Sequence, residues 1–211
     1  MLIKACGLSS GETIAAAAQA GATHVGLVHF APSPRHVDLA DAAKLRAAVP
    51  QKVKAVVLLV DPEADLLAAV IAQVKPDVIQ LHGKETPEQS ARLRQQGGFE
   101  VWKALSVRSA ESLADAARYE GAVDRVLFDA PPPADSTLPG GNGEAFDWTL
   151  LKGHDHRIAW GLAGGLTPNN VADAIRATGT PLVDASSGLE SAPGVKDMDR
   201  IAAFCAAALD A

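Results

Sequence analysis

Two short loops rich in glycine and serine contain the residue types best suited to hold a phosphate group. Each loop follows a short apolar run and leads towards a helix, and their small residues are Gly164, Gly165, Ser186 and Ser187. Backbone N–H groups in such loops are not shielded by side chains, and a helix N-terminus adds partial positive charge. Two such loops near the end of an α/β chain predict a phosphate site on the last two strands of a barrel, and hence a small phosphorylated ligand.

Residues at the ends of the predicted strands are the next candidates for catalytic or binding roles, because a parallel barrel places its active site at the carboxyl ends of its strands. They include a thiol, two imidazoles and two carboxylates. A carboxylate that ends a buried strand is costly without a partner or a use, which favours function for Asp129 and Asp184. Either could instead cap the turn that follows it. The eight strand-end residues are Cys6, His29, Leu59, His82, Ala104, Asp129, Gly161 and Asp184.

Cys6 is the candidate reactive thiol. Most lone cysteines are small buried hydrophobes, but this one stands at a strand end beside Gly7. Lys4 has the same strand parity as Cys6, so the two side chains point the same way. A buried lysine needs an anionic partner, which the sequence does not identify, and its charge would help keep Cys6 as thiolate. Cys205 lies on the apolar face of the last helix and is predicted to be core.

Arg35 and three histidines complete the candidate polar residues. Arg35 follows two prolines, and its planar guanidinium suits two-point binding of a carboxylate, although a surface arginine is usually only solvated. His82 could donate to a substrate or orient a neighbour. His154 and His156 precede the seventh strand, at the opposite end of the barrel, and are predicted to be solvated surface. No cluster has the spacing of metal ligands, so we expect no metal.

These residues need a scaffold of alternating strands and helices, and the apolar pattern predicts one from end to end. Eight strands with no doubled strand imply an all-parallel sheet, and closure into a barrel removes both of its edges. The predicted strands are Leu2–Cys6, His24–Val28, Lys54–Val60, Val78–Leu81, Glu100–Ala104, Arg125–Phe128, Ile158–Gly161 and Leu182–Asp184. The predicted helices are Gly11–Ala20, Leu39–Ala48 and Pro62–Val74, followed by helices that begin near Pro87, Ser109, Phe146, Pro168 and Asp197.

The predicted fold class is therefore α/β, with a single-domain (β/α)8 TIM barrel over residues 1–211. The alternative is an open doubly wound sheet, which usually has fewer strands and a dinucleotide-type glycine loop after the first strand. The turn at Cys6–Gly11 lacks that spacing. One segment, Ala130–Gly143, interrupts the alternation after the sixth strand, and a loop of this length is typical of a lid or a binding loop.

Composition narrows the class of partner. The chain has 211 residues, 48% of them apolar, and a net charge of −6, which argues against nucleic acid and membrane surfaces as partners. It has no leader-like segment and no apolar run near the length of a membrane span, so a cytoplasmic location is expected. The two cysteines have no redox-like or metal-like neighbours. Alanine-rich outer helices leave both a monomer and a homodimer open.

Seven blocks of residues carry a resemblance that extends over the whole chain. They are Ile3–Gly7, Gly26–His29 with Ser33–Arg35, Gln80–Gly83, Leu127–Asp129, Gly140–Gly143 with Phe146–Trp148, Leu162–Leu166 and Val183–Gly188. In this order they resemble the successive motifs of the phosphoribosylanthranilate isomerase family. The residues Glu190, Gly194, Lys196 and Asp197 fit the same pattern.

The resemblance implies an isomerase of tryptophan biosynthesis that needs no cofactor. Its reaction is the Amadori rearrangement of N-(5-phosphoribosyl)anthranilate to 1-(2-carboxyphenylamino)-1-deoxyribulose 5-phosphate. Carried over by position, Cys6 is the general base and Asp129 the general acid, which must arrive protonated. Arg35 would hold the anthranilate carboxylate, and Asp184 would contact the sugar or the bridging amine. The remaining residues implied to bind substrate are His82, Gly141 and Asn142, and those implied to bind phosphate are Gly164, Gly165, Ser186 and Ser187.

The chain departs from the family pattern at four positions. Leu27 and His29 stand in a block that is usually richer in aromatic residues, so we expect a different wall around the anthranilate ring. Asn142 replaces a more common Ser or Thr in the flexible loop, and Ala5 replaces a more usual Ile. None of these changes removes a proposed catalytic group.

Two other functions are weighed against this one. One alternative is the related aminoaldose isomerase of histidine biosynthesis, which is also a phosphate-binding barrel. Its acid–base pair looks like two aspartates, and its substrate, which carries two phosphates, needs a second phosphate loop. Here the first strand ends in Cys6, and the first half of the chain contains no matching loop. A non-catalytic barrel that only binds phosphometabolites would be expected to lack Cys6 or Asp129, and both are present.

Overall fold

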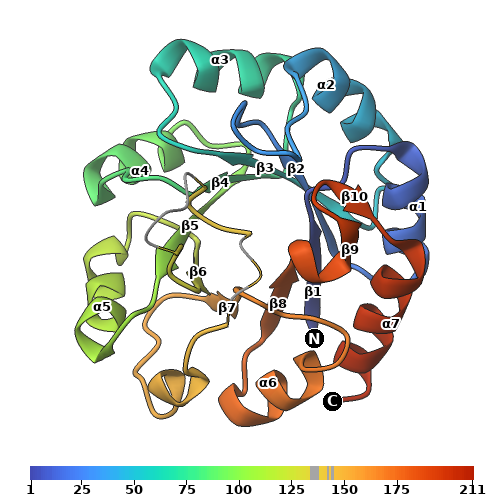
Figure 1. Ribbon diagram of the computed structural model, residues 1–211. Coiled ribbons are helices and arrows are strands. Elements are labelled where there is room, and N and C mark those ends of the chain that lie inside the picture. Colours follow the sequence, from blue (N-terminus) through green and yellow to red (C-terminus); the bar gives the residue numbers. More distant parts are fainter. Residues whose placement is uncertain (134–137, 142, 144) are drawn as a thin grey trace.

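Eight parallel strands close into a barrel, and helices surround it (Figure 1). The structure is a computed structural model that describes residues 1–133, 138–141, 143 and 145–211. Each strand pairs with its neighbours in chain order, and β1 pairs with β8 to complete the ring. The strands are β1 (Leu2–Cys6), β2 (His24–Val28), β3 (Lys54–Leu59), β4 (Val78–Leu81), β5 (Glu100–Ser106), β6 (Arg125–Asp129), β7 (Trp160–Leu162) and β8 (Leu182–Ala185). The predicted barrel is confirmed, with strand ends shifted by at most two residues.

Several of the outer helices begin where the sequence supplies a side-chain cap. Ser10, Asp38 and Thr86 each accept a hydrogen bond from a backbone N–H in the first turn of their helix, as N-cap side chains do. Pro87 occupies the first turn of α4, as predicted. The α-helices in the described part of the chain are α1 (Gly11–Gln19), α2 (Leu39–Ala48), α3 (Ala64–Gln73), α4 (Pro87–Arg94), α5 (Ala110–Ala114), α6 (Val171–Thr178) and α7 (Met198–Leu209).

The connection between β6 and β7 differs from the prediction. A helix was expected from Phe146, but the described residues form only a short 3-10 turn, η2 (Trp148–Leu151), capped by the Asp147 side chain. Gly153 follows almost at once with a positive φ of 76°. The stretch is therefore too short to repay the cost of nucleating an α-helix. A second 3-10 segment, η1 (Asp115–Tyr119), extends α5.

One element was not predicted at all. After β8 and the 3-10 turn η3 (Ser187–Leu189), the chain forms an antiparallel hairpin of β9 (Glu190–Ala192) and β10 (Val195–Lys196) before α7 begins. In Figure 1 this hairpin lies beside the end of β1. It belongs to the loops at the carboxyl ends of the strands, where the candidate site lies.

The core has two layers, because successive side chains of a strand point to opposite faces. One face of the strands packs against the helices, where Ile3, Val25 and Leu27 are fully buried. The other face fills the barrel. Its lower part holds Val56, Val78, Trp102, Ala104, Leu127 and Leu182. Higher up, Cys6 packs with Val28 and Leu58, which places the thiol at the base of the barrel mouth.

None of the helices in the described residues is both long enough and apolar enough to cross a membrane.

Candidate active site

A cavity at the carboxyl ends of the strands gathers residues from β1, β2, β3, β4, β6 and β8 and from loops that follow the strands, including the loop after β7. The described part of the 130–143 loop also lines it, through Pro131, 138–141 and Gly143. Asn142, which the resemblance assigned to substrate binding, lies outside the described residues. The predicted site residues that line this cavity are Cys6, Arg35, His82, Asp129, Gly141, Gly164, Gly165, Asp184, Ser186 and Ser187.

The other strand-end candidates do not reach this cavity. Leu59 faces the helix layer, and Ala104 and Gly161 sit deeper in the barrel. The ring of His29 lies within hydrogen-bond distance of the Val37 carbonyl, with Nδ1 2.8 Å from the oxygen. For Leu59 and His29 strand parity is the reason, because only alternate residues face the interior. Ala104 and Gly161 do face the interior, but they lie below the barrel mouth.

The prediction that Leu27 and His29 alter the ring wall is therefore wrong. Leu27 is fully buried between the barrel and its helices, and neither residue lines the cavity. The apolar wall consists instead of Val28, Leu58 and the side chains that follow their strands, Phe30 and Val60.

Lys4 finds its anionic partner in Asp184. The two residues are register partners across the β1–β8 closure, and Lys4 Nζ donates to Asp184 Oδ2 at 2.8 Å. Both side chains are almost fully enclosed, at 0% and 8% exposed. Burial alone would lower the pKa of Lys4, but the attraction of Asp184 and of Cys6 outweighs it, and the pKa is raised. The lysine therefore remains charged beside the thiol.

Cys6 is 4% exposed and lies next to that ion pair. Burial raises the pKa of its thiol above the ordinary value, against the opposing attraction of Lys4 and of Lys196. The predicted effect of Lys4 thus has the expected sign, but desolvation is larger. The thiol is consequently protonated at neutral pH, and its thiolate fraction depends on the two nearby cations.

Asp129 is held by fewer groups. Its Oδ1 accepts from the backbone N–H of Ala130 at 2.8 Å, and its Oδ2 lies 3.2 Å from Nε2 of His82. The side-chain amide of Gln80 donates to Nδ1 of His82 at 3.3 Å, which leaves the Nε2–H of the imidazole to face Asp129. Gln80 is 1% exposed, and its Oε1 has no partner within the described chain.

Gly164 brings the loop after β7 against the carboxylate of Asp129. Its φ is +80°, and a Cβ atom at this position would lie 2.4 Å from the backbone nitrogen of Ala130 and 2.9 Å from Asp129 Oδ1. Only glycine fits both the conformation and the space. The same residue that exposes backbone for a phosphate thus also packs against the candidate acid.

The second loop that was predicted to bind phosphate is anchored to β1. Ser186 Oγ donates to the carbonyl oxygen of Cys6 at 3.2 Å, and Lys196 Nζ donates to the Ser186 carbonyl at 2.9 Å. Ser186 and Ser187 are half-buried at the cavity wall. A lysine ammonium therefore stands beside the loop that was predicted to hold phosphate, which provides the local cation an anionic ligand needs.

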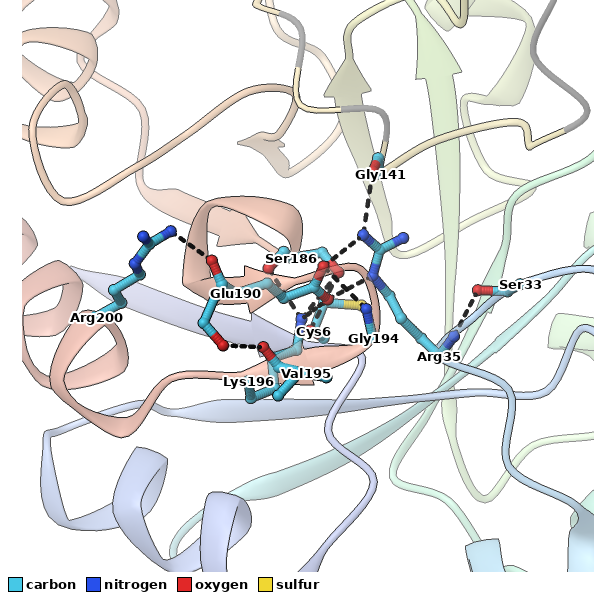
Figure 2. A network of polar contacts seen from close by, with 11 residues as sticks. Cys6, Ser33, Arg35, Gly141, Ser186, Glu190, Gly194, Val195, Lys196 and Arg200 are labelled. Atoms are coloured by element: carbon cyan, nitrogen blue, oxygen red, sulfur yellow. Dashed lines mark hydrogen bonds and ion pairs between the residues drawn. The ribbon is translucent and has the colours of Figure 1, made fainter.

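Arg35 is buried rather than solvated, and it already has a carboxylate partner. Its Nε donates to Glu190 Oε1 at 2.7 Å and its Nη2 to Glu190 Oε2 at 2.9 Å (Figure 2). Nη2 also donates to the Gly141 carbonyl at 3.2 Å. The predicted two-point grip exists, but within the protein it is made to Glu190. Arg35 still lines the cavity, where Nη1 has no acceptor among the described residues and Nη2 can exchange its bond to Gly141 for one to a ligand.

Two further sequence predictions concern residues away from the cavity. Cys205 is fully buried on α7, and burial raises the pKa of its thiol to about 11, as expected for a core cysteine. The prediction of a solvated His154–His156 loop is wrong for His156. Its ring stacks on Trp160 with centroids 4.0 Å apart, and burial lowers its pKa to about 4.

Sequence reasoning missed roles for Gln80, Glu190 and Lys196. Gln80 shares the strand parity of His82, which is a signal that could have placed it on the cavity wall. Glu190 and Lys196 carried no such signal. They contact Arg35 and Ser186 because the β9–β10 hairpin pairs them across its two strands, and that hairpin was not predicted.

Comparison with known proteins gives one consistent family. Residues 3–207 match the family model described as N-(5′-phosphoribosyl)anthranilate isomerase. The isomerase of that name from Erythrobacter litoralis is 63% identical over 210 residues, which cover 100% of this chain and 99% of the relative.

Solved structures agree with that family. A phosphoribosyl anthranilate isomerase in complex with reduced 1-(o-carboxyphenylamino)-1-deoxyribulose 5-phosphate is 30% identical, with a TM-score of 0.87 and complete coverage of both chains. Monomers generated from the dimeric enzyme of Thermotoga maritima are also 30% identical, with a TM-score of 0.86 and complete coverage. Monomeric and dimeric forms therefore both occur among the structural neighbours.

Proposed function

The chain belongs to the N-(5′-phosphoribosyl)anthranilate isomerase family, and on that premise we propose that Cys6 is the general base and Asp129 the general acid of its reaction. The enzyme is an isomerase of tryptophan biosynthesis that rearranges N-(5-phosphoribosyl)anthranilate to 1-(2-carboxyphenylamino)-1-deoxyribulose 5-phosphate. The observation that carries the residue assignment is their common cavity. It is lined by one thiol, one carboxylic acid with a histidine partner, a buried arginine and both small-residue loops.

The first step asks Asp129 to act as an acid. Its proton passes to the ring oxygen of the ribose, the C1′–O bond breaks, and the nitrogen lone pair forms an iminium with C1′. The Oδ2 atom faces His82, whose Nε2–H can stabilise the carboxylate that remains. The Ala130 N–H on Oδ1 supports the same charged form.

The second step asks Cys6 to act as a base. The thiolate takes the C2′ proton, which the iminium has made acidic. The electron pair of that C–H bond forms the C1′–C2′ double bond of an enolamine, and the π pair of the C1′–N bond returns to nitrogen. Lys4 and Lys196 favour the thiolate over the thiol. The enolamine then tautomerises to the ketone, so no cofactor or metal is invoked.

The remaining groups of the cavity fit the rest of the substrate. We assign Arg35 to the anthranilate carboxylate and the loops at Gly164–Gly165 and Ser186–Ser187 to the phosphate. Asp184 uses Oδ2 for Lys4, and its buried Oδ1 has no partner among the described residues, so it can accept from the sugar or the bridging amine. Gly141 borders the same space. We propose that the partner is a small phosphorylated substrate, that the enzyme works in the cytoplasm, and that it binds neither nucleic acid nor a membrane.

The test is the loss of anthranilate-type fluorescence when the purified protein meets freshly generated phosphoribosylanthranilate. Cys6→Ser should slow the decay by about a thousandfold or more, because general base catalysis is worth that order. Cys205→Ser is the matched control, since it removes the other buried thiol outside the cavity and should leave the rate near normal.

Binding of the reduced product analogue separates loss of chemistry from loss of the site. We expect Cys6→Ser to retain that binding. If Cys6→Ser turned over substrate at a near-normal rate, the role of Cys6 as general base would be refuted. If the unaltered protein binds the analogue but produces no decay, the chain is instead a phosphometabolite-binding barrel or acts on another aminoaldose.

A further inference from the structure

One buried carboxylate, Glu190, joins two basic side chains, Arg35 at the cavity wall and Lys196 behind the loop at Ser186. Its Oε1 accepts from Arg35 Nε at 2.7 Å and from Lys196 Nζ at 2.6 Å, and its Oε2 accepts from Arg35 Nη2 at 2.9 Å (Figure 2). The three side chains are 7%, 1% and 4% exposed for Arg35, Lys196 and Glu190. Such an enclosed cluster is held by its internal contacts rather than by water.

The backbone fixes where this carboxylate stands. Glu190 and Lys196 are register partners in the β9–β10 hairpin, and the guanidinium of Arg200 donates to the Glu190 carbonyl. The Gly194 N–H reaches Oε2 at 3.3 Å. Gly194 has a φ of +81°, and a Cβ there would lie 2.5 Å from the carbonyl oxygen of Pro34. The turn of the hairpin therefore docks directly against the residue that precedes Arg35.

The consequence for Arg35 follows from the shape of its side chain. A guanidinium offers two edges to a carboxylate, one through Nε and Nη2 and one through Nη1 and Nη2. Glu190 fills the first edge. On the second edge, Nη2 makes only a 3.2 Å bond to Gly141, and Nη1 has no acceptor in the described part of the chain. A ligand carboxylate can be accepted only at this second edge.

We propose that Glu190 is a positioning residue that holds Arg35 with one edge filled, so that the substrate carboxylate is bound end-on through the Nη atoms. The same carboxylate keeps Lys196 against Ser186, where the ammonium donates to the carbonyl and the hydroxyl of that serine. Glu190 thereby fixes Arg35 relative to the loop that we assign to the phosphate. This inference rests on the proposed function, because it assumes that the substrate carries an ortho-carboxylate and a phosphate.

The charge state of the cluster agrees with this arrangement. Burial alone would raise the pKa of Glu190, but the hydrogen bonds from Arg35 and Lys196 outweigh it and hold the pKa below its ordinary value. Glu190 is therefore an anion between two basic side chains, and of these Arg35 lines the cavity.

The experiment compares two ligands that differ only in the carboxylate. They are the reduced product analogue and the same compound built on aniline, with affinities measured by calorimetry. Glu190→Asp keeps the charge but is one methylene too short to reach both cations. We expect it to weaken the carboxylated analogue about tenfold, the cost of releasing one or two ordered side chains, and the aniline analogue by less than about twofold.

Two further variants protect the test from a folding artefact. Glu190→Gln keeps the length and removes the charge, and the same selective loss is expected. Glu85→Gln is the matched control, because Glu85 is equally buried and pairs with Lys103 at 3.0 Å outside the Arg35 cluster. It should leave the ratio of the two affinities unchanged. In an Arg35→Ala background, Glu190→Asp should cause no further loss for the carboxylated analogue.

The outcomes separate the two levels of inference. Equal weakening of both analogues, or unchanged affinity for the carboxylated one, would overturn the role of Glu190 while leaving the isomerase function intact. An unaltered protein that binds neither analogue would remove the proposed function and this inference with it. If neither Glu190 variant folds, Arg35→Lys provides the test. Lysine has no second edge for a carboxylate, so this variant must weaken the carboxylated analogue more than the aniline analogue.

Discussion

The two sides of the cavity are built differently. Around Cys6, buried ion pairs join neighbouring strands and the β9–β10 hairpin, with Lys4 bound to Asp184 and Lys196 bound to Glu190. Around Asp129, the contacts are one imidazole at 3.2 Å and the backbone N–H of the next residue. The thiol side thus shares its charges with the framework of the barrel. The acid side is a local arrangement at one strand end.

This difference has a physical consequence. Breaking a buried ion pair leaves an uncompensated charge in a medium of low dielectric, so it destabilises the fold as well as the site. Replacing His82, whose side chain is 13% exposed at the cavity wall, changes one contact of Asp129 and leaves the strand framework in place. We therefore expect stability and activity to fall together on the Cys6 side and to separate on the Asp129 side.

The largest expected effect is that of Asp129→Asn. Asparagine has the same shape and can still accept from the Ala130 N–H, but it cannot give a proton to the ribose oxygen. We expect kcat to fall by about a thousandfold or more, with the free energy of unfolding changed by less than about 1 kcal/mol. Stopped-flow fluorescence and urea unfolding measure the two quantities. A large loss of stability would show that the acid side is also part of the framework.

Lys4→Met tests the Cys6 side of the cavity, where we expect a large loss of stability. It leaves Asp184 buried and unpaired, which should cost about 3–5 kcal/mol of unfolding free energy. Lys54→Met is the control, because Lys54 also pairs with a carboxylate, that of Glu100, but its side chain is 50% exposed. That change should cost less than about 1 kcal/mol. Similar losses in urea unfolding for the two variants would contradict the distinction between buried and exposed pairs.

His82→Gln should cost activity without stability. Glutamine can still donate towards Asp129 but lacks the ring that faces Oδ2 at 3.2 Å. We expect kcat to fall about ten- to a hundredfold, in the lower range of general acid–base effects, with unfolding free energy within about 0.5 kcal/mol of the unaltered protein. If urea unfolding shifts as strongly as it does for Lys4→Met, the two sides of the cavity are not distinct in the way described.

The strands of the barrel could be predicted from sequence because each is a local apolar run bounded by turn residues. Cys6, His82 and Asp129 followed from the rule that strand ends form the site. The contacts could not be predicted in the same way. Asp184 is 180 residues from Lys4, and Glu190 is 155 residues from Arg35. No local pattern encodes such distant pairings.

The missed elements have local causes. The β9–β10 hairpin has strands of three and two residues, too short for an alternating pattern, and it is fixed by the docking of its turn against Pro34. The expected helix from Phe146 fails because Gly153 follows its cap too closely. A local glycine thus ends the expected helix, whereas a tertiary contact decides the conformation of the hairpin.

The smallest expected effect is a shift in the pH dependence of kcat/KM. Activity needs the Cys6 thiolate, and burial raises the pKa of that thiol, so kcat/KM should still be rising with pH in the alkaline range. The charge of Lys196 lowers this pKa, so Lys196→Met should raise it further and move the rising limb to higher pH. Because the cation is one of several, the shift should be about one pH unit or less. His82→Gln should leave that limb in place, since the pKa of Cys6 depends on the cations of its own side. A limb that moves equally in both variants would mean that the two sides of the cavity titrate as one unit.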